Sequence, residues 1–224
     1  LQVFDPDPNY GTQDAVNDTR CVNFQAGPDE TVNFIVDNQM PGGEPRTPGY
    51  WKNWNSCSGG NQYDNAQLNG GSASGWWTLD DLLPQTVGDL VVGHDDLSME
   101  EACEEGVNLL NKSDLRGKKR ANDAAYNLVT ALLAAKLNVS AGACQPTSEE
   151  MDEEGYGSYD SIIEVIAAAD DLLIAVDFNG KGSYLSPKDT KEEPEKTQAQ
   201  TALTLAGILD AYNNSMICTG DETH

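Results

Sequence analysis

The chain has 224 residues, with 37 acidic against 13 basic side chains, a formal net charge of −24 and a pI near 4.1. Nucleic acids and anionic lipid surfaces repel such a polyanion, so we expect neither as a partner. The sequence contains no run of 18 apolar residues, so we also expect no membrane insertion. This length fits one large domain with a small appendage.

Residues 1–40 predict a small N-terminal β element. Two short runs, RCVNFQAG and TVNFIVDN, alternate or are rich in β-branched residues, and Gly27-Pro28-Asp29-Glu30 between them is a turn signal. Two strands alone are marginal in water, so they must pack on the helical part or pair with another sheet edge, which a neighbouring subunit can supply. The expected assembly strands contain Val22, Phe24, Val32, Phe34 and Val36.

Residues 41–75 form a loop-rich segment that contains the aromatic motif TPGYWKNW. Its rings could stack on sugars, or they could hold the loops against a core. Tryptophan is mostly buried in proteins, and loops need large anchors, so we favour the second interpretation. The aromatic anchor residues are Tyr50, Trp51, Trp54, Trp76 and Trp77.

The chain after Trp77 is predicted to be helical. Thr78 is a candidate N-cap of a short helix that Pro84 ends, and Ser98 and Glu101 form a capping box at the start of the next helix. The acidic, glycine-bearing stretch 149–160 is expected to be a mobile loop. Helices are expected over 78–83, 98–110, 121–138, 161–176 and 197–214.

Apolar residues at helical spacing define the expected core of the three longest helices. The sequence therefore predicts a mainly α fold, a compact bundle of four to five helices with a loop-rich aromatic segment and the small N-terminal β element. The expected core residues are Ala125, Leu128, Val129, Leu132 and Ala135; then Ile162, Val165, Ile166, Ala169 and Leu173; then Ala202, Leu205, Ile208, Leu209 and Tyr212.

The cysteines and glycosylation sequons favour a secreted or cell-surface chain. Five dispersed cysteines without a neighbouring histidine indicate disulfides and not zinc, with two bridges and one odd thiol that can pair between molecules. The chain starts at Leu1 and not at Met, which we interpret as removal of a leader. The disulfide candidates are Cys21, Cys57, Cys103, Cys144 and Cys218, and the glycosylation candidates are Asn17, Asn111, Asn138 and Asn213.

The sequence predicts no enzyme. Its histidines are His94 and His224, and neither a zinc-protease, a nucleophile-elbow nor a phosphate-loop motif is present. A glycoside hydrolase needs only two carboxylates, but no pair of acids stands out among the 37.

The stretch Asp177-Phe-Asn179-Gly-Lys181-Gly182 begins like a calcium-binding loop. Its end departs from that pattern, because Lys188 stands where a bidentate glutamate belongs, and Asp189 would have to substitute one residue later. We favour an ordinary loop between two helices, and keep calcium, bound by Asp177, Asn179 and Asp189, as the alternative.

Several segments together resemble a group of secreted bacterial and archaeal proteins with a Gly-Tyr-Trp-Lys signature. The resemblance rests on TPGYWKN at 47–53, ALLAAKLNVSAGA at 131–143, IAAADDLLIA at 166–175, LDAYNN at 209–214 and Cys218. It implies an exported or surface protein without established catalytic activity. Trp54 stands where the group often has histidine, and Met216-Ile217 replaces its Gly-Pro, so any role of that histidine is lost here.

These observations predict a non-catalytic extracellular structural protein, such as a cell-surface, matrix or filament subunit that self-associates through its N-terminal strands. The expected organisation is a β element over 1–40 and a helical domain over 41–224. The alternative is an extracellular binding module for glycans or for calcium-dependent adhesion, with a hydrolase as the weakest hypothesis.

Overall fold

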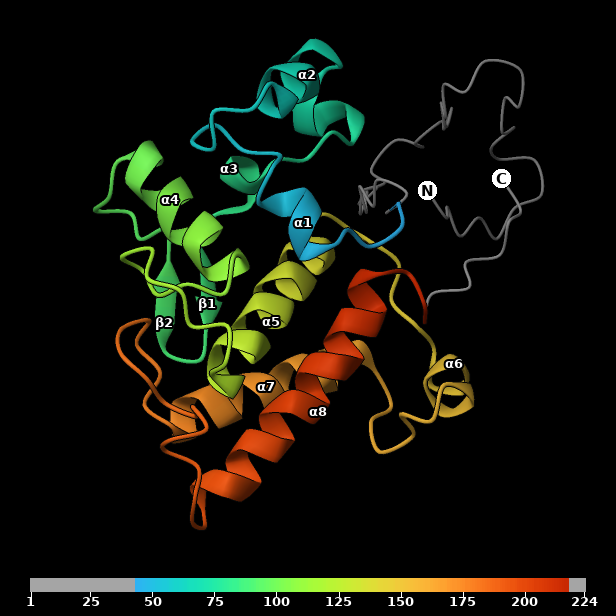
Figure 1. Ribbon diagram of the computed structural model, residues 1–224. Helices are drawn as coiled ribbons and strands as arrows, with labels where there is room; N and C mark the ends of the chain where they lie inside the picture. Colours follow the sequence, from blue (N-terminus) through green and yellow to red (C-terminus); the bar gives the residue numbers. More distant parts are fainter. Residues whose placement is uncertain (1–42, 218–224) are drawn as a thin grey trace, which may run out of the picture. The chain divides into compact units, whose positions relative to one another are not determined.

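The computed structural model describes residues 43–217 (Figure 1). The predicted strands around Val22 and Phe34, the sequon at Asn17, and Cys21 and Cys218 lie outside the described residues. The elements are α1 (Pro48–Trp51), α2 (Gln62–Leu68), the 3-10 helix η1 (Gly71–Ser74), α3 (Leu79–Leu82), β1 (Gln85–Val87), β2 (Leu90–Val92), α4 (Met99–Leu110), α5 (Ala124–Ser140), α6 (Ser148–Glu153), α7 (Ile162–Ala175) and α8 (Glu195–Asn213).

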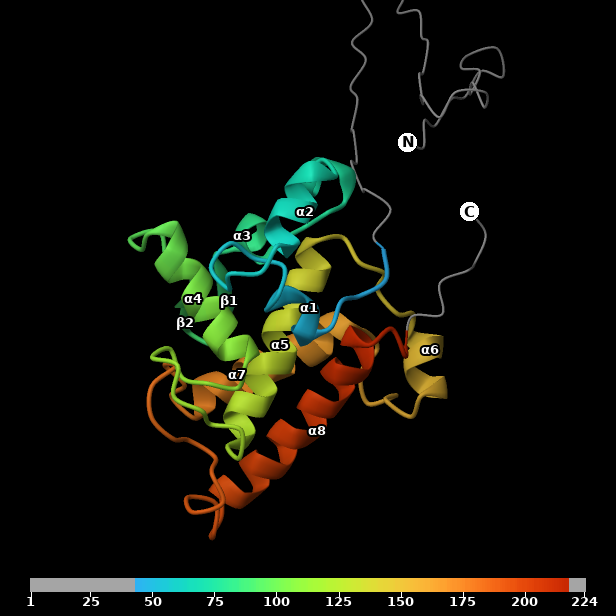
Figure 2. The same cartoon turned by 45° about the horizontal axis from the view of Figure 1, so that its top comes forward.

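Helix α5 is the centre of the described fold. It contacts α1, α3, α4, α7, α8 and β1, and Figures 1 and 2 show α8 running beside it. Its sequence is rich in alanine and leucine, the best helix formers, and Asp123 caps its first turn. Most of its side chains are buried, because neighbours surround it and the small alanines let them approach closely. The mainly helical fold class is therefore confirmed.

The apolar stripes expected on the long helices form the core. All fifteen residues expected to face inward on α5, α7 and α8 are buried, including Tyr212 at the end of α8. The capping boxes at Thr78 with Asp81 and at Ser98 with Glu101 are both present, so α3 and α4 begin where the sequence predicts. Helix α3 ends at Leu82, directly before the Leu83-Pro84 pair.

A short antiparallel hairpin of β1 and β2 was not predicted from the sequence. Gln85 pairs with Val92, and Val87 pairs with Leu90 across a two-residue turn. Gly88 in this turn has a φ of 59°, and its N–H donates to the Asp170 carboxylate at 2.7 Å. Val87 and Val92 are fully buried, so the hairpin contributes to the core despite its length.

Two parts of the chain expected to be loops contain helices. The stretch 149–160 was predicted to be a mobile loop, and this is wrong for its first part, which forms α6. Thr147 and Glu150 form a capping box that starts α6, and the fully buried Met151 holds it against the core. Within 41–75, α1, α2 and η1 interrupt the predicted loop.

A disulfide joins Cys57 in the aromatic segment to Cys103 in α4. It therefore fixes the loop-rich segment to the helical core across 46 residues of sequence. Cys144 is also disulfide-bonded. Between residues 43 and 217, no helix combines the length and the apolar character that crossing a membrane requires.

Candidate functional site

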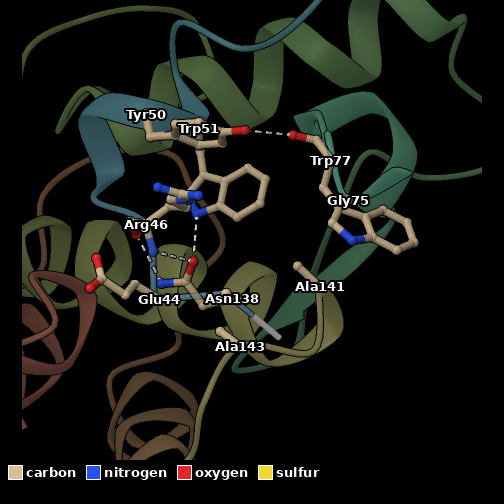
Figure 3. A pocket seen from close by; sticks show the side chains of 10 residues that line it. Glu44, Arg46, Tyr50, Trp51, Gly75, Trp77, Asn138, Ala141 and Ala143 are labelled. Carbon is tan, nitrogen blue, oxygen red and sulfur yellow. Dashed lines mark hydrogen bonds between the residues drawn. The ribbon is translucent and has the colours of Figure 1, made fainter. Parts of the chain in front are cut away.

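Four distant residues meet at the carboxyl end of α5 in a cluster that we call the amide node: Arg46, Trp51, Asn138 and Asn213. The Asn138 Oδ1 accepts from the backbone N–H of Arg46 at 2.8 Å and from the Trp51 indole Nε1–H at 3.1 Å. Its Nδ2 donates to the Arg46 carbonyl and to Asn213 Oδ1, both at 2.9 Å. Figure 3 shows Asn138 below Trp51 with these bonds to Trp51 and Arg46.

All hydrogen-bonding groups of the Asn138 side chain, at the centre of the amide node, have partners. An asparagine amide carries two N–H donors and an oxygen with two acceptor sites, and Asn138 uses all four. Asn213 donates in turn to the Ala131 carbonyl at 2.9 Å, which ties α8 to α5. Asn138 and Asn213 are fully buried and Trp51 is 1% exposed, so these three side chains are part of the core and do not form an open polar surface. Arg46 joins them through its backbone, while the residue itself is exposed.

The pocket beside the amide node is too small for a typical ligand. It has a volume of about 50 Å³ and is lined in part by Tyr50, Trp77 and Ala141 (Figure 3). Ligand sites commonly have a volume of about 300–1,000 Å³, whereas this space suits a few water molecules. The Tyr50 hydroxyl donates to the Trp77 carbonyl at 3.1 Å and closes one side of it. Burial raises the pKa of Tyr50 and outweighs the opposing effect of the Arg46 charge.

The predicted aromatic anchor divides into a buried ring and a partly exposed stack. Trp51 is the buried ring, in edge contact with Tyr50. The Tyr50 ring stacks on Trp54 with centroids 4.9 Å apart, and Trp54 stacks on Trp76 at 5.5 Å. Trp76 is 38% exposed, so the anchor interpretation does not describe it fully. Because stacking already covers ring faces, the remaining aromatic surface is centred on Trp76.

Two of the glycosylation candidates are incompatible with this fold. Asn138 and Asn213 have no exposed surface, and a glycan on either side chain would remove an amide that the node uses. The prediction is therefore corrected for both positions. Asn111 is exposed at the end of α4, although the hydroxyl-bearing residue of its sequon, Ser113, is 1% exposed.

A second buried polar residue, Asp123, holds the loop between α7 and α8 against the start of α5. One carboxylate oxygen accepts from the N–H groups of Ala125 at 3.0 Å and Leu185 at 3.1 Å. The other accepts from the Ser183 hydroxyl at 3.1 Å and the Tyr184 N–H at 2.9 Å. We call this arrangement the carboxylate clamp. It explains how a loop of polar and glycine residues keeps one conformation.

The expected calcium ligands have structural roles in the same loop. Asp177 adopts a φ of 51° directly after α7, and the next N–H, from Phe178, bonds back to Leu173, which is the geometry that ends a helix. Asn179 Oδ1 accepts from the Lys181 N–H and the Tyr184 hydroxyl. The Asp189 carboxylate accepts from the Ser186 hydroxyl and shares the Ser183 hydroxyl with Asp123, and these hydrogen bonds lower the pKa of Asp189.

The side-chain oxygens of Asn179 and Asp189 therefore have hydrogen-bond partners within the loop, whereas the role of Asp177 lies in its backbone conformation. The Tyr184 hydroxyl occupies the loop interior, where it also donates to the Lys181 carbonyl at 2.6 Å. Within residues 43–217, no three or more His, Cys, Asp or Glu side chains are grouped so that they could hold a metal ion. This geometry does not fit a calcium site without rearrangement of the loop.

A larger pocket, with a volume of about 270 Å³, lies between α3, the open end of the hairpin and the start of α4. Leu83, Pro84, Leu97 and Met99 give it an apolar lining. His94, the histidine of the described chain, stands at its edge, and its Nδ1 accepts from the Asp96 N–H at 3.2 Å. Among the described hydrogen bonds, none joins His94 to a serine or cysteine side chain, so they contain no nucleophile–base pair at this pocket.

Asp123 was not among the site residues predicted from the sequence. Asn138 and Asn213 were predicted as glycosylation sites and not as core residues. A signal for the asparagines was available, because Asn138 lies four residues after Ala134 and Asn213 lies four residues after Leu209, both on buried stripes. Asp123 is an ordinary N-cap by sequence, and its loop partners are about sixty residues away.

Comparison with known proteins identifies no relative. No protein-family profile, curated protein sequence or solved structure matches this chain.

Proposed function

We propose that this protein is a non-catalytic extracellular structural subunit that self-associates into a surface, matrix or filament assembly. The observation that carries the proposal is the closed amide node. Trp51, Asn138 and Asn213 belong to three segments of the Gly-Tyr-Trp-Lys signature, and all three side chains point into one buried, fully bonded cluster. The structural role of these three side chains supports a function that does not depend on catalysis.

The described body is fixed by several long-range connections, as expected for a building unit. The Cys57–Cys103 disulfide, the amide node and the carboxylate clamp each join segments more than 40 residues apart. A disulfide is typical of proteins that work outside the reducing cytosol, and this supports an extracellular location. A net charge of −24 keeps such a unit soluble, but it also opposes unspecific association, so contacts between copies must be specific.

Self-association through the N-terminal strands can be tested with the full chain. Phe34→Asp introduces a charge into a predicted assembly strand, whereas Leu68→Asp makes the same change at a side chain that is 84% exposed on α2. Sedimentation velocity and negative-stain electron microscopy should show assemblies for the wild type and Leu68→Asp, and smaller species for Phe34→Asp. A wild type that stays monomeric at all concentrations, with and without calcium, would contradict the proposal.

The alternative function is glycan binding at the exposed end of the aromatic stack. It is favoured by Trp76, which is 38% exposed and stacks on Trp54. A titration with oligosaccharides should then quench tryptophan fluorescence in the wild type and not in Trp76→Ala. A calcium-dependent form of this function would use Asp177, Asn179 and Asp189, and it requires a thermal midpoint that falls when a chelator is added.

A further inference from the structure

One loop concentrates positive charge in this strongly acidic chain. Residues 112–120, between α4 and α5, contain five of the 13 basic residues, and we call this segment the basic loop. Of these, Arg120 pairs with Asp114, and the Lys119 Nζ donates to the Asn111 carbonyl. Lys112, Arg116 and Lys118 are exposed and form no ion pair with any side chain in residues 43–217.

The basic loop is held in one conformation before any partner arrives. Asp114, which is 5% exposed, accepts from the N–H groups of Arg116 at 3.2 Å and Lys118 at 3.0 Å, and from the Arg120 guanidinium. Leu115 donates its N–H to the Gly180 carbonyl at 3.0 Å. Because the backbone of the loop is already ordered, binding through its cations costs entropy mainly at their side chains.

The opposite charge is concentrated at the other end of α4, in what we call the acidic pole: Asp95, Asp96, Glu100, Glu101, Glu104 and Glu105. No lysine or arginine occurs between residues 89 and 111, so nothing in this stretch neutralises the pole. The pocket of about 270 Å³ opens beside it, lined by Asp80, Asp95 and several apolar side chains. Met99, which is 68% exposed, adds apolar surface there. Such a surface suits lysine and arginine, whose aliphatic stems pack on apolar groups while the charged head meets a carboxylate.

The basic loop and the acidic pole of one molecule are too far apart to form ion pairs with each other. Helix α4 has 12 residues and separates them by about 18 Å at 1.5 Å per residue. Two copies that each carry a charge of −24 repel each other overall, so a contact between their helical bodies is favoured where opposite charges face each other. Among the described residues, the basic loop has three unpaired cations within seven positions, whereas the unpaired lysines that follow α7 are interspersed with Asp189, Glu192, Glu193 and Glu195.

We propose that the basic loop of one copy docks on the acidic pole and its pocket in a second copy of this chain. This inference rests on the proposed self-association and names a contact of the helical body that supports it. Reciprocal contacts between two copies would close a dimer, whereas a one-way contact would continue from copy to copy into a chain.

Charge exchange in the full chain tests the contact. Arg116→Glu with Lys118→Glu removes the net positive charge of the loop, from five basic residues against Asp114 to three against three acids, without changing Asp114, Arg120 or their hydrogen bonds. Asp95→Lys with Glu104→Lys leaves four of the six acids of the pole and adds two lysines, so it weakens the negative charge there outside the capping box of α4. Each double variant alone should self-associate at least about tenfold more weakly than the wild type in sedimentation equilibrium. An equimolar mixture of the two should recover association into pairs, because the unchanged loop of the pole variant then meets the unchanged pole of the loop variant.

A matched control separates this contact from the effect of net charge. Lys188→Glu with Lys191→Glu changes the charge by the same amount at exposed positions of another loop, and it should associate like the wild type. The inference is overturned if the loop variant or the pole variant associates like the wild type, or if the mixture does not recover. It is also overturned if the loop variant keeps wild-type association and loses only retention on a sulfated polysaccharide column, which would assign the loop to an anionic polymer. A wild type that never associates would instead refute the proposed function itself.

Discussion

The two ends of α5 each use one buried polar side chain to hold distant segments, but they differ in charge. Asn138, near the carboxyl end, is neutral and both donates and accepts, so it can join a tryptophan, a backbone segment and a second amide. Asp123, at the amino end, only accepts, and it gathers four donors from its own helix and one loop. Figure 1 shows that different parts of the chain meet at these two ends.

This difference indicates what each end can tolerate. A carboxylate in a buried site is stabilised only while it is surrounded by donors, as Asp123 is by backbone N–H groups and a hydroxyl. The amide node contains two carbonyl-type acceptors opposite Asn138 Nδ2, where a carboxylate would be repelled. Exchanging the two side-chain types should therefore damage both ends, and the amide node more.

The largest effect is expected for Asn138→Asp. The new carboxyl group cannot donate to the Arg46 carbonyl and to Asn213 Oδ1, and its charge would be buried beside them. The free energy of unfolding should fall by about 3–5 kcal/mol, measured by urea denaturation. Asn111→Asp makes the same chemical change at an exposed position and should change it by less than about 0.5 kcal/mol. Equal midpoints for the two variants would show that the node does not hold the core.

Asp123→Asn should have the next largest effect. One carboxylate oxygen becomes an NH₂ group that faces donors, so at least one backbone N–H loses its acceptor. The expected loss is about 2–3 kcal/mol of unfolding free energy. Hydrogen exchange at Tyr184 and Leu185 should accelerate before exchange at the amide node. Asp171→Asn, at an exposed position of α7, is the matched control and should leave both regions unchanged.

A smaller effect is expected for Trp51→Phe, which keeps an aromatic ring and removes the indole donor to Asn138. The loss of one hydrogen bond and of part of the buried ring should cost about 1–2 kcal/mol. Trp76→Phe at the exposed end of the stack should cost less than about 0.5 kcal/mol. If Trp76→Phe is the more destabilising change in thermal unfolding, the buried ring is not the anchor of this segment.

The fold class and the inward faces of the long helices could be predicted because both depend on local periodicity and capping. The residues Leu128, Val165 and Leu205 are buried where a 3.6-residue repeat places them. The hairpin was missed although Gly88-Asp89 between short apolar runs is a turn signal. Its three-residue strands gave too little alternation to be distinguished from a loop.

The two polar ends of α5 could not be predicted, because their partners are distant in the sequence. Asn138 was interpreted as a glycosylation sequon, since Asn-Val-Ser matches that pattern wherever it lies. Only the packing of α5 against α8 and the segment at Arg46 shows that its amide is enclosed. The D-x-N-x-x-G pattern matches the loop at Asp177 by residue type, but it does not show that the hydroxyl of Tyr184, a few residues later, bonds to Asn179 and Lys181.

The smallest and most specific expected effect is the order in which the two ends open in acid. At the amino end of α5, burial acts to raise the pKa of Asp114, but hydrogen bonds from Lys118, Arg120 and Arg116 together lower it. The pKa of the exposed Asp189 is also lowered, by the hydroxyls of Ser186 and Ser183. The hydrogen bonds of the amide node involve no titrating side chain.

A carboxyl group with a lowered pKa in the folded state stabilises the fold above its unfolded pKa, near 3.9 for aspartate, and this contribution is lost as the pH falls through the folded value. The amino end of α5 should therefore loosen first as the pH falls from about 5 to about 2. In an NMR titration, the amide signals of Arg116 and Lys118, whose N–H groups donate to Asp114, should shift or broaden at a higher pH than the indole N–H signal of Trp51. If the Trp51 signal changes first, the neutral node is the weaker end, and the contrast between the two ends of α5 is reversed.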